Sequence, residues 1–238
     1  ECDFAKIGRQ CISDGIKLGT GIIEGPVNTV KARSKWRQVT DPETGTSLHV
    51  IEEEINIKPE ARIVDPWNYF PDMSARNMQE CEFHSERFLL TKRQLRDLAK
   101  DETFLADQIR EVLRGEPART TADYIDKLRS IGSFSFSEAF NRYEVWKYHG
   151  PVDRDDLIAA GVEVDDDPLE EYNAIVWICE NRVIKAIMNP DETDEFTYSV
   201  FNWEEDEASI FGYGIPYLLR NPQKVFFRLK STSNLIKA

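Results

Sequence analysis

The sequence lacks the residue patterns by which metal sites and the best-known catalytic sites are recognised. Its 3 histidines and 4 cysteines are scattered, and none stand at HxxxH or CxxC spacing. No G-x-S-x-G elbow marks a nucleophilic serine. The run Asp165–Asp167 lacks the alternating ligands of a calcium loop. The sequence therefore predicts no catalytic residue, no metal ligand and no cofactor.

Long apolar runs and paired cysteines are also missing. No run approaches the roughly 20 apolar residues of a membrane-spanning helix, so we expect no membrane partner. The irregular spacing of the cysteines favours a reducing compartment and buried thiols over a disulfide framework. The first residue is Glu1 and not Met, so we expect a fragment or a trimmed form of a longer chain.

A nucleotide-binding loop is not supported by the glycine-rich segment that begins at Gly19. The third glycine, Gly25, follows Gly21 after three residues, whereas the dinucleotide fingerprint needs two. The order of elements is also reversed, because a helix is expected before this segment and strands after it. We interpret it as a helix stop, a short strand and a tight turn at Gly25–Pro26.

The charge of the chain is acidic and unevenly distributed. The 238 residues carry a net charge of −13. Residues 153–207 hold 18 acidic and 3 basic groups, whereas residues 208–238 hold 5 basic groups and no acidic ones. An acidic chain is poorly suited to binding the phosphates of nucleic acids, which requires Lys and Arg side chains. We predict three regions: an α+β region over 1–152, an acidic hairpin region over 153–223 and a basic tail over 224–238.

Hydrophobic periodicity in the first 90 residues predicts mainly strands. Residues 3–18 repeat apolar positions at helical spacing, and Gly19 is a natural helix stop. After it we expect a strand at Ile22–Ile23, an antiparallel hairpin over 29–57 with its turn at 41–45, a strand at Ile63–Val64, a buried aromatic loop over 65–72 and a strand over 80–90.

The rest of the chain mixes helices and strands, so the predicted class is α+β, with antiparallel strands and hairpins beside packed helices. Residues 91–131 read as a helical middle. We expect its helices to start at a capping box from Thr91 to Gln94, at Asp101 or Thr103, and at Thr120 or Thr121. Further along the chain we expect a strand over 141–148, which Gly150–Pro151 ends, and then a helix over 153–161. A hairpin of Tyr172–Ile178 and Val183–Met188 should follow, and after it a strand over 196–203. Last, we expect a loop from Ser209 that leads into a helix with Pro216 in its first turn.

Four segments, in order along the chain, resemble the portal proteins of tailed double-stranded DNA bacteriophages, most closely those of short-tailed phages. They are GTGIIEGPV from Gly19, PWNYFPD from Pro66, YEVWKYHGP with the later DLIAAG, and FGYGIPYLLRNPQ from Phe211. The motif residues that carry the resemblance are Gly19, Gly21, Gly25, Pro26, Trp67, Pro71, Asp72, Gly150, Phe211, Gly212, Gly214 and Pro216.

The resemblance implies a structural and non-enzymatic role. Portal proteins form a dodecameric ring at one capsid vertex, through which double-stranded DNA passes during packaging and ejection. The implied fold is the portal wing, and the implied partners are further copies of the chain, terminase, capsid and tail adaptor proteins. The implied location is the virion, and the host cytoplasm during assembly.

Two departures from the portal pattern limit what the resemblance implies. Portal chains are much longer, and here the similarity fades after Gln223. The segment Lys224–Ala238 lacks the sustained apolar periodicity of a stem helix, so we expect an isolated wing or a truncated prophage copy.

Two other function classes stay open at this point. A hydrolase acting on a polymer could use paired carboxylates, and an adaptor could dock a basic partner on its acidic region. The five tryptophans could line a sugar groove, but we predict that they are core residues.

Overall fold

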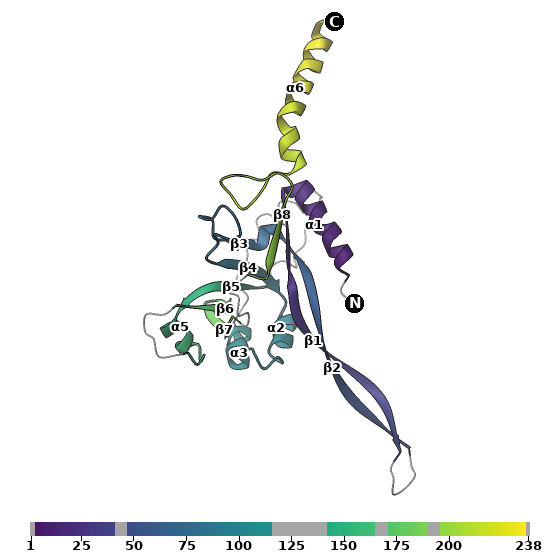
Figure 1. Cartoon of the computed structure of the whole chain (residues 1–238), viewed down its shortest axis with the longest axis vertical. Helices are drawn as coiled ribbons and strands as arrows, with labels where there is room; N and C mark the ends of the chain where they lie inside the picture. The colour runs from purple at the N-terminus through teal and green to yellow at the C-terminus, as the bar shows by residue number, and fades with distance from the viewer. Residues whose placement is uncertain (1–2, 41–46, 116–141, 165–170, 190–195, 237–238) are drawn as a thin grey trace. The chain divides into compact units, whose positions relative to one another are not determined.

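The computed structural model describes residues 3–40, 47–115, 142–164, 171–189 and 196–236, of which residues 28–40, 47–57 and 228–236 are described by their backbone alone (Figure 1). Helices and antiparallel sheets are both present, which confirms the α+β class. The chain forms two compact units. Unit 1 comprises Glu1–Val64, Thr197–Glu205 and Phe211–Ala238, and unit 2 comprises Asp65–Phe196 and Asp206–Ile210.

Unit 1 is a three-stranded antiparallel sheet with one helix before it and one after it. The strand order is β2-β1-β8. Its elements are α1 (Phe4–Leu18), β1 (Thr20–Thr40), β2 (Ser47–Val64), β8 (Tyr198–Asn202) and α6 (Ile215–Ile236).

Helix α1 begins and ends as its sequence predicts. The side chain of Asp3 accepts a hydrogen bond from the backbone N–H of Lys6, which caps the first turn. Gly19 ends the helix in the left-handed region, at φ 110°, and its N–H donates to the carbonyl of Gly15. A glycine reaches this conformation without the steric penalty of a Cβ atom.

Unit 2 is a five-stranded antiparallel sheet of order β3-β4-β5-β6-β7 with short helices against it. Its elements are a 3-10 turn, η1 (Pro66–Asn68), followed by β3 (Tyr69–Pro71), β4 (His84–Leu90), α2 (Lys92–Leu98), α3 (Ala106–Arg114), β5 (Tyr143–Asp153), α5 (Arg154–Ala159), β6 (Glu171–Cys179) and β7 (Arg182–Met188).

Two apolar clusters hold unit 2 together. In the larger one, α2 and α3 pack against strands β5, β6 and β7; its buried members are Leu95, Phe104, Ile109, Val112, Tyr143, Val145, Cys179 and Ile184. In the smaller one, Leu157 of α5 packs with Ala174 and Val176 of β6. The helices are short, so their burial and not their propensity holds them in place.

Several local predictions are confirmed. The Thr91 side chain accepts from the Gln94 N–H and the Gln94 side chain accepts from the Thr91 N–H, which completes the capping box. The turn between β6 and β7 lies at Glu180 and Asn181, both with positive φ of 49° and 65°. Paired positive φ values are what a two-residue hairpin requires.

The predicted break at Gly25–Pro26 is wrong. Strand β1 continues through it, and the register shifts from Glu24 opposite Arg62 to Val27 opposite Glu60. The two residues thus form a bulge and not a turn. The expected separate strand at Ile63–Val64 is the end of β2 for the same reason: each strand continues because its partner does.

Two more predicted boundaries are wrong. Gly150 and Pro151 do not end β5, because they pair with Ala174 and Asn173 of β6 and the strand runs on to Asp153. Neither Asp101 nor Thr103 caps α3, which starts after Leu105 without a side-chain cap. Asp101 instead accepts from the N–H and hydroxyl of Thr103 in a local turn.

Helix α6 also corrects the prediction for the tail. It extends to Ile236 through Pro222, so the described part of 224–238 continues the helix that Pro216 opens. The boundaries of the two units differ from those of the three predicted regions. Strand β8 pairs with β1, so residues near 200 belong to the same unit as the first 64 residues.

Some predictions fall outside the described residues. They are the turn at 41–45, the helix from Thr120 or Thr121, the surroundings of Cys2 and Asp165–Asp167. No helix among the residues that the structure describes is long and apolar enough to cross a membrane.

Candidate functional site

The first and last of the four portal-like segments meet in unit 1, at the base of α6. A Cβ atom placed on Gly19 would lie 2.1 Å from the carbonyl oxygen of Gly212 and 2.9 Å from the nitrogen of Gly214. A Cβ atom on Gly214 would in turn lie 2.8 Å from the nitrogen of Gly19. Such distances leave no room for a side chain, so the two backbones touch only because both residues are glycine.

Hydrogen bonds fix the same contact, which we call the glycine junction (residues 17–21, 202–204 and 211–214). The Gly212 N–H donates to the Thr20 hydroxyl at 2.8 Å, and this hydroxyl donates to the Asn202 side chain at 2.8 Å. Two backbone bonds continue the network, from Trp203 N–H to Gly19 O and from Tyr213 N–H to Glu204 O. Thr20 is buried, so its satisfied hydroxyl contributes to stability.

Gly21 extends the junction to α1, because a Cβ atom there would lie 2.1 Å from the carbonyl oxygen of Cys11. Helix α6 then starts from the junction, where the N–H groups of Tyr217 and Leu218 donate to the carbonyl of Gly214. The glycine junction therefore fixes the base of α6 to the end of α1 and the start of β1.

Other motif residues of unit 1 have smaller structural roles. Gly25 and Pro26 form the β1 bulge, where a Cβ atom on Gly25 would lie 2.8 Å from the Cα of Ala61. Pro216 stands exposed in the first turn of α6, where its missing N–H costs no helical bond. Phe211 is half-buried beside the junction.

The motif residues of unit 2 lie apart from the glycine junction in sequence and belong to another sheet. Pro71 and Asp72 are buried and Gly150 approaches Phe83, where a Cβ atom would meet the Phe83 Cβ at 2.6 Å. Trp67, however, is 46% exposed and Phe70 is exposed too. The prediction of a buried aromatic loop is thus right for Tyr69 and Pro71 and wrong for Trp67 and Phe70. Phe70 faces solvent because residues alternate between the two faces of the short edge strand β3, and Trp67 lies in the turn η1 before that strand.

A buried histidine pair is the feature that sequence reasoning missed. His84 of β4 lies directly opposite His149 of β5, and Pro71 of β3 is the next residue in the same row. The Tyr69 hydroxyl lies 2.5 Å from His84 Nδ1, and the ring of Phe196 packs edge-on against both imidazoles. The two histidines are 65 residues apart, so only the strand register could reveal the pair.

The surroundings of His84 favour its neutral form. Burial, and secondarily His149, lowers the pKa of His84 to about 4, although Asp72 opposes this. Burial also raises the pKa of Tyr69 above its ordinary value. The Tyr69 hydroxyl and His84 Nδ1 therefore share a hydrogen bond between two uncharged groups, in which the tautomer of the imidazole sets which one donates. Hydrogen bonds from Ser74 lower the pKa of Asp72, which stays ionised.

The buried thiols of unit 2 are held in their protonated form. Burial raises the pKa of Cys81 to about 11 and of Cys179 to about 12, which leaves both thiols protonated and unreactive at neutral pH. Within the described ranges, no group of three or more His, Cys, Asp or Glu residues is placed to hold a metal ion.

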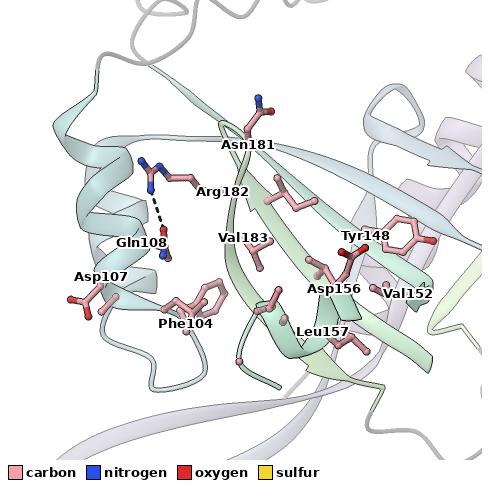
Figure 2. Close-up of a pocket in the computed structure, with 18 residues that line it drawn as sticks. Phe104, Asp107, Gln108, Tyr148, Val152, Asp156, Leu157, Asn181, Arg182 and Val183 are labelled. Carbon is pink, nitrogen blue, oxygen red and sulfur yellow. Dashed lines mark hydrogen bonds between the residues drawn. The ribbon is translucent and has the colours of Figure 1, made fainter. Parts of the chain in front are cut away.

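A pocket of about 910 Å³ lies in unit 2 between α3, α5 and the sheet (Figure 2). Its floor is apolar and includes Val176, Ile178 and Val183. Figure 2 shows its two labelled carboxylates on different walls: Asp107 on α3 points away from the cavity, while Asp156 lies on α5. Asp107 is also paired with Arg110 at 2.7 Å. This arrangement lacks the two converging carboxylates that a glycoside hydrolase uses.

The four tryptophans whose side chains the structure describes divide between the packed interior and the surface, and the side chain of Trp36 lies outside the described residues. Trp177 stacks on Phe88 with ring centroids 5.2 Å apart, and Trp146 packs against Phe70. Trp67 and Trp203 are exposed, so the prediction that all five are core residues is wrong for these two. Both lie where the chain leaves a strand or enters one, and such positions offer fewer neighbours to cover a large ring.

The sequence matches no known family model, and no curated protein matches it significantly.

Proposed function

We propose that this chain is a structural subunit of a phage portal ring, the assembly through which DNA enters and leaves the capsid. The observation that carries the proposal is the glycine junction. The segments GTG at Gly19 and FGYG at Phe211 lie about 190 residues apart, and both resemble segments of portal proteins. They interlock backbone to backbone where the long helix α6 begins.

Helix α6 supports the proposal because it exposes several large apolar side chains. Its 22 residues span about 33 Å. Leu218, Leu219, Val225 and Phe226 follow helical spacing along one side, which we call the α6 stripe, and each is exposed, Phe226 by 63%. Exposed apolar side chains gathered in this way are typical of an interface. In a ring, the neighbouring copies would cover them.

The remaining parts of the proposal follow from the portal assignment. The partners would be further copies of this chain, terminase, capsid and tail adaptor proteins, at a capsid vertex of the virion. Double-stranded DNA would pass without sequence-specific contacts, in keeping with a net charge of −13.

The experiment is native mass by light scattering on a sizing column across protein concentration, with negative-stain images. We expect closed rings of many subunits. Leu218→Lys together with Phe226→Lys should abolish them, because both changes place charge on the α6 stripe. Asn221→Lys, which adds a charge beside the stripe, is the control and should assemble. A wild-type chain that stays monomeric at every concentration would contradict the proposal.

A further inference from the structure

The distal part of the β1–β2 hairpin, residues 27–40 and 47–60, forms a long two-stranded ribbon. Its 14-residue strands span about 46 Å. Strand β8 covers the outer edge of β1 only at Thr20–Glu24. In the part of the chain that the structure describes, no strand pairs with β1 beyond this point except β2. Two strands alone are marginally stable in water, so a ribbon of this length calls for a further partner.

The register divides the residues of the ribbon between two unlike faces. One face holds three apolar register pairs: Val30 with Ile57, Ala32 with Ile55, and Trp36 with Ile51. The pair Ser34 and Glu53 interrupts them. The other face holds the ion-pair combinations Arg33 with Glu54 and Lys35 with Glu52. Alternation of residues along each strand produces this division.

The charged face is itself divided between the two strands. On this face β1 contributes a row of cations, and β2 contributes Glu52 and Glu54 between Val50 and Asn56, with Lys58 nearer the base. We call these the basic row and the acidic row. The members of the basic row are Lys31, Arg33, Lys35 and Arg37.

We propose that the ribbons of neighbouring copies of this chain associate edge to edge, with the basic row of β1 in one copy beside the acidic row of β2 in the next. The inference rests on the proposed ring, and it names the surface by which the copies recognise each other. The neighbouring β2 would continue, antiparallel to β1, along the edge where β8 stops.

Charge complementarity selects this arrangement over the alternatives. Two β1 edges brought together would oppose four cations to four, and two β2 edges would oppose glutamates to glutamates, both of which are unfavourable. Only the contact between a β1 edge and a β2 edge places opposite charges beside each other. An interface between unlike edges is heterologous, and heterologous contacts generate closed rings when the rotation closes. Such a ring would also leave no open strand edge on the ribbons.

The test is self-sorting between the wild-type chain and a row-inverted variant. The variant changes all four cations of the basic row to Glu and both Glu52 and Glu54 to Lys. Its two ion-pair combinations inside the ribbon are inverted but kept, so the ribbon itself should still fold. Mixed with wild type, however, it would place like charges beside each other between copies.

We expect the variant to form rings by itself and to exclude wild-type copies. The two chains, one of them ¹⁵N-labelled, are unfolded, mixed and refolded, and the ring masses are read by native mass spectrometry. Mixed rings should fall about tenfold or more below the statistical proportion. The matched control swaps an exposed ion pair at the C-terminal end of α2, Asp97→Lys with Lys100→Asp, and it should mix statistically with wild type.

Statistical mixing of the row-inverted variant would overturn this inference while leaving the ring, and so the proposed function, intact. The same result would follow if the ribbons met through their apolar faces. A variant that folds but does not assemble alone would also overturn it. A wild-type chain that forms no rings would overturn both proposals.

Discussion

At the scale of single residues, glycines matter here through the space that they leave. Gly19 combines a positive φ with a contact that a Cβ atom would occupy, and Gly214 approaches the same backbone from the other side. Neither the positive φ nor the close contact can be inferred from the presence of a glycine alone. Gly8 in α1 has nothing within 4 Å of its Cβ position, so it carries no such constraint.

Gly19→Ala should lower the free energy of unfolding by roughly 2 to 4 kcal/mol, because it adds both backbone strain and overlap. Gly8→Ala should raise it by about 0.5 to 1 kcal/mol, since alanine favours the helix. Urea unfolding followed by circular dichroism measures both. Hydrogen exchange should locate the loss in α1, β8 and residues 211–223. Equal stability of Gly19→Ala and wild type would show that the glycine junction tolerates a side chain.

The buried histidine predicts how stability depends on pH. The folded-state pKa of His84 is about 4, below its ordinary value of 6.5, so folding disfavours the protonated imidazole. The contribution of neutral His84 to the free energy of unfolding is fully present above pH 6.5 and is lost as the pH falls towards 4. The loss should reach roughly 3 kcal/mol. Asp72, whose pKa is lowered, adds a further loss only at more acidic pH.

Urea unfolding at a series of pH values between 7 and 4 tests this expectation. His84→Gln keeps a side chain that can hydrogen-bond to Tyr69 but cannot titrate, so its stability should vary less over this range even if it is lower throughout. His49→Gln, in the ribbon, is the control and should keep the wild-type slope. An unchanged slope in His84→Gln would assign the acid sensitivity to other groups.

At the scale of elements, short helices in this chain depend on one or two buried side chains. Helix α5 has six residues and no side-chain cap, so its own turns are not stable alone. Leu157 is 1% exposed and packs with Ala174 and Val176, whereas the adjacent Ile158 is 46% exposed. Burial of Leu157 is therefore what holds α5 on the sheet.

Leu157→Ala should cost about 2 to 4 kcal/mol of unfolding free energy, the usual range for a buried leucine. Ile158→Ala, one residue away and of the same chemistry, should change stability by less than about 0.5 kcal/mol. Thermal and urea unfolding of the two variants compare them directly. Similar losses in both would mean that α5 packs through another face than the one described.

At the scale of the whole molecule, exposed apolar side chains are grouped at regular spacing on α6, while others are spread singly over both units. The α6 stripe is exposed, and among the described strands the distal ribbon has no partner beyond its own two strands. Isolated exposed apolar residues need no explanation, but grouped ones at regular spacing favour an assembly. The proposed ring would cover the stripe and pair the ribbon edges.

The sequence by itself determined the features that depend on near neighbours along the chain. The helix 3–18 and its stop at Gly19, the Thr91–Gln94 capping box and the β6–β7 hairpin all follow from spacing, caps and turn residues. The caps, the helical bonds and the hairpin turn join residues four or fewer apart, so their contribution to stability can be judged from the local sequence. The α+β class follows from the same signals.

Tertiary structure alone decided the features that depend on a distant partner. Strand β1 passes Gly25–Pro26, and β5 passes Gly150–Pro151, because a neighbouring strand continues to pair with each. The contact between Gly19 and Gly214 and the pairing of His84 with His149 arise in the same way. Pairing register and backbone approach are set by the whole sheet, so no local pattern in the sequence specifies them.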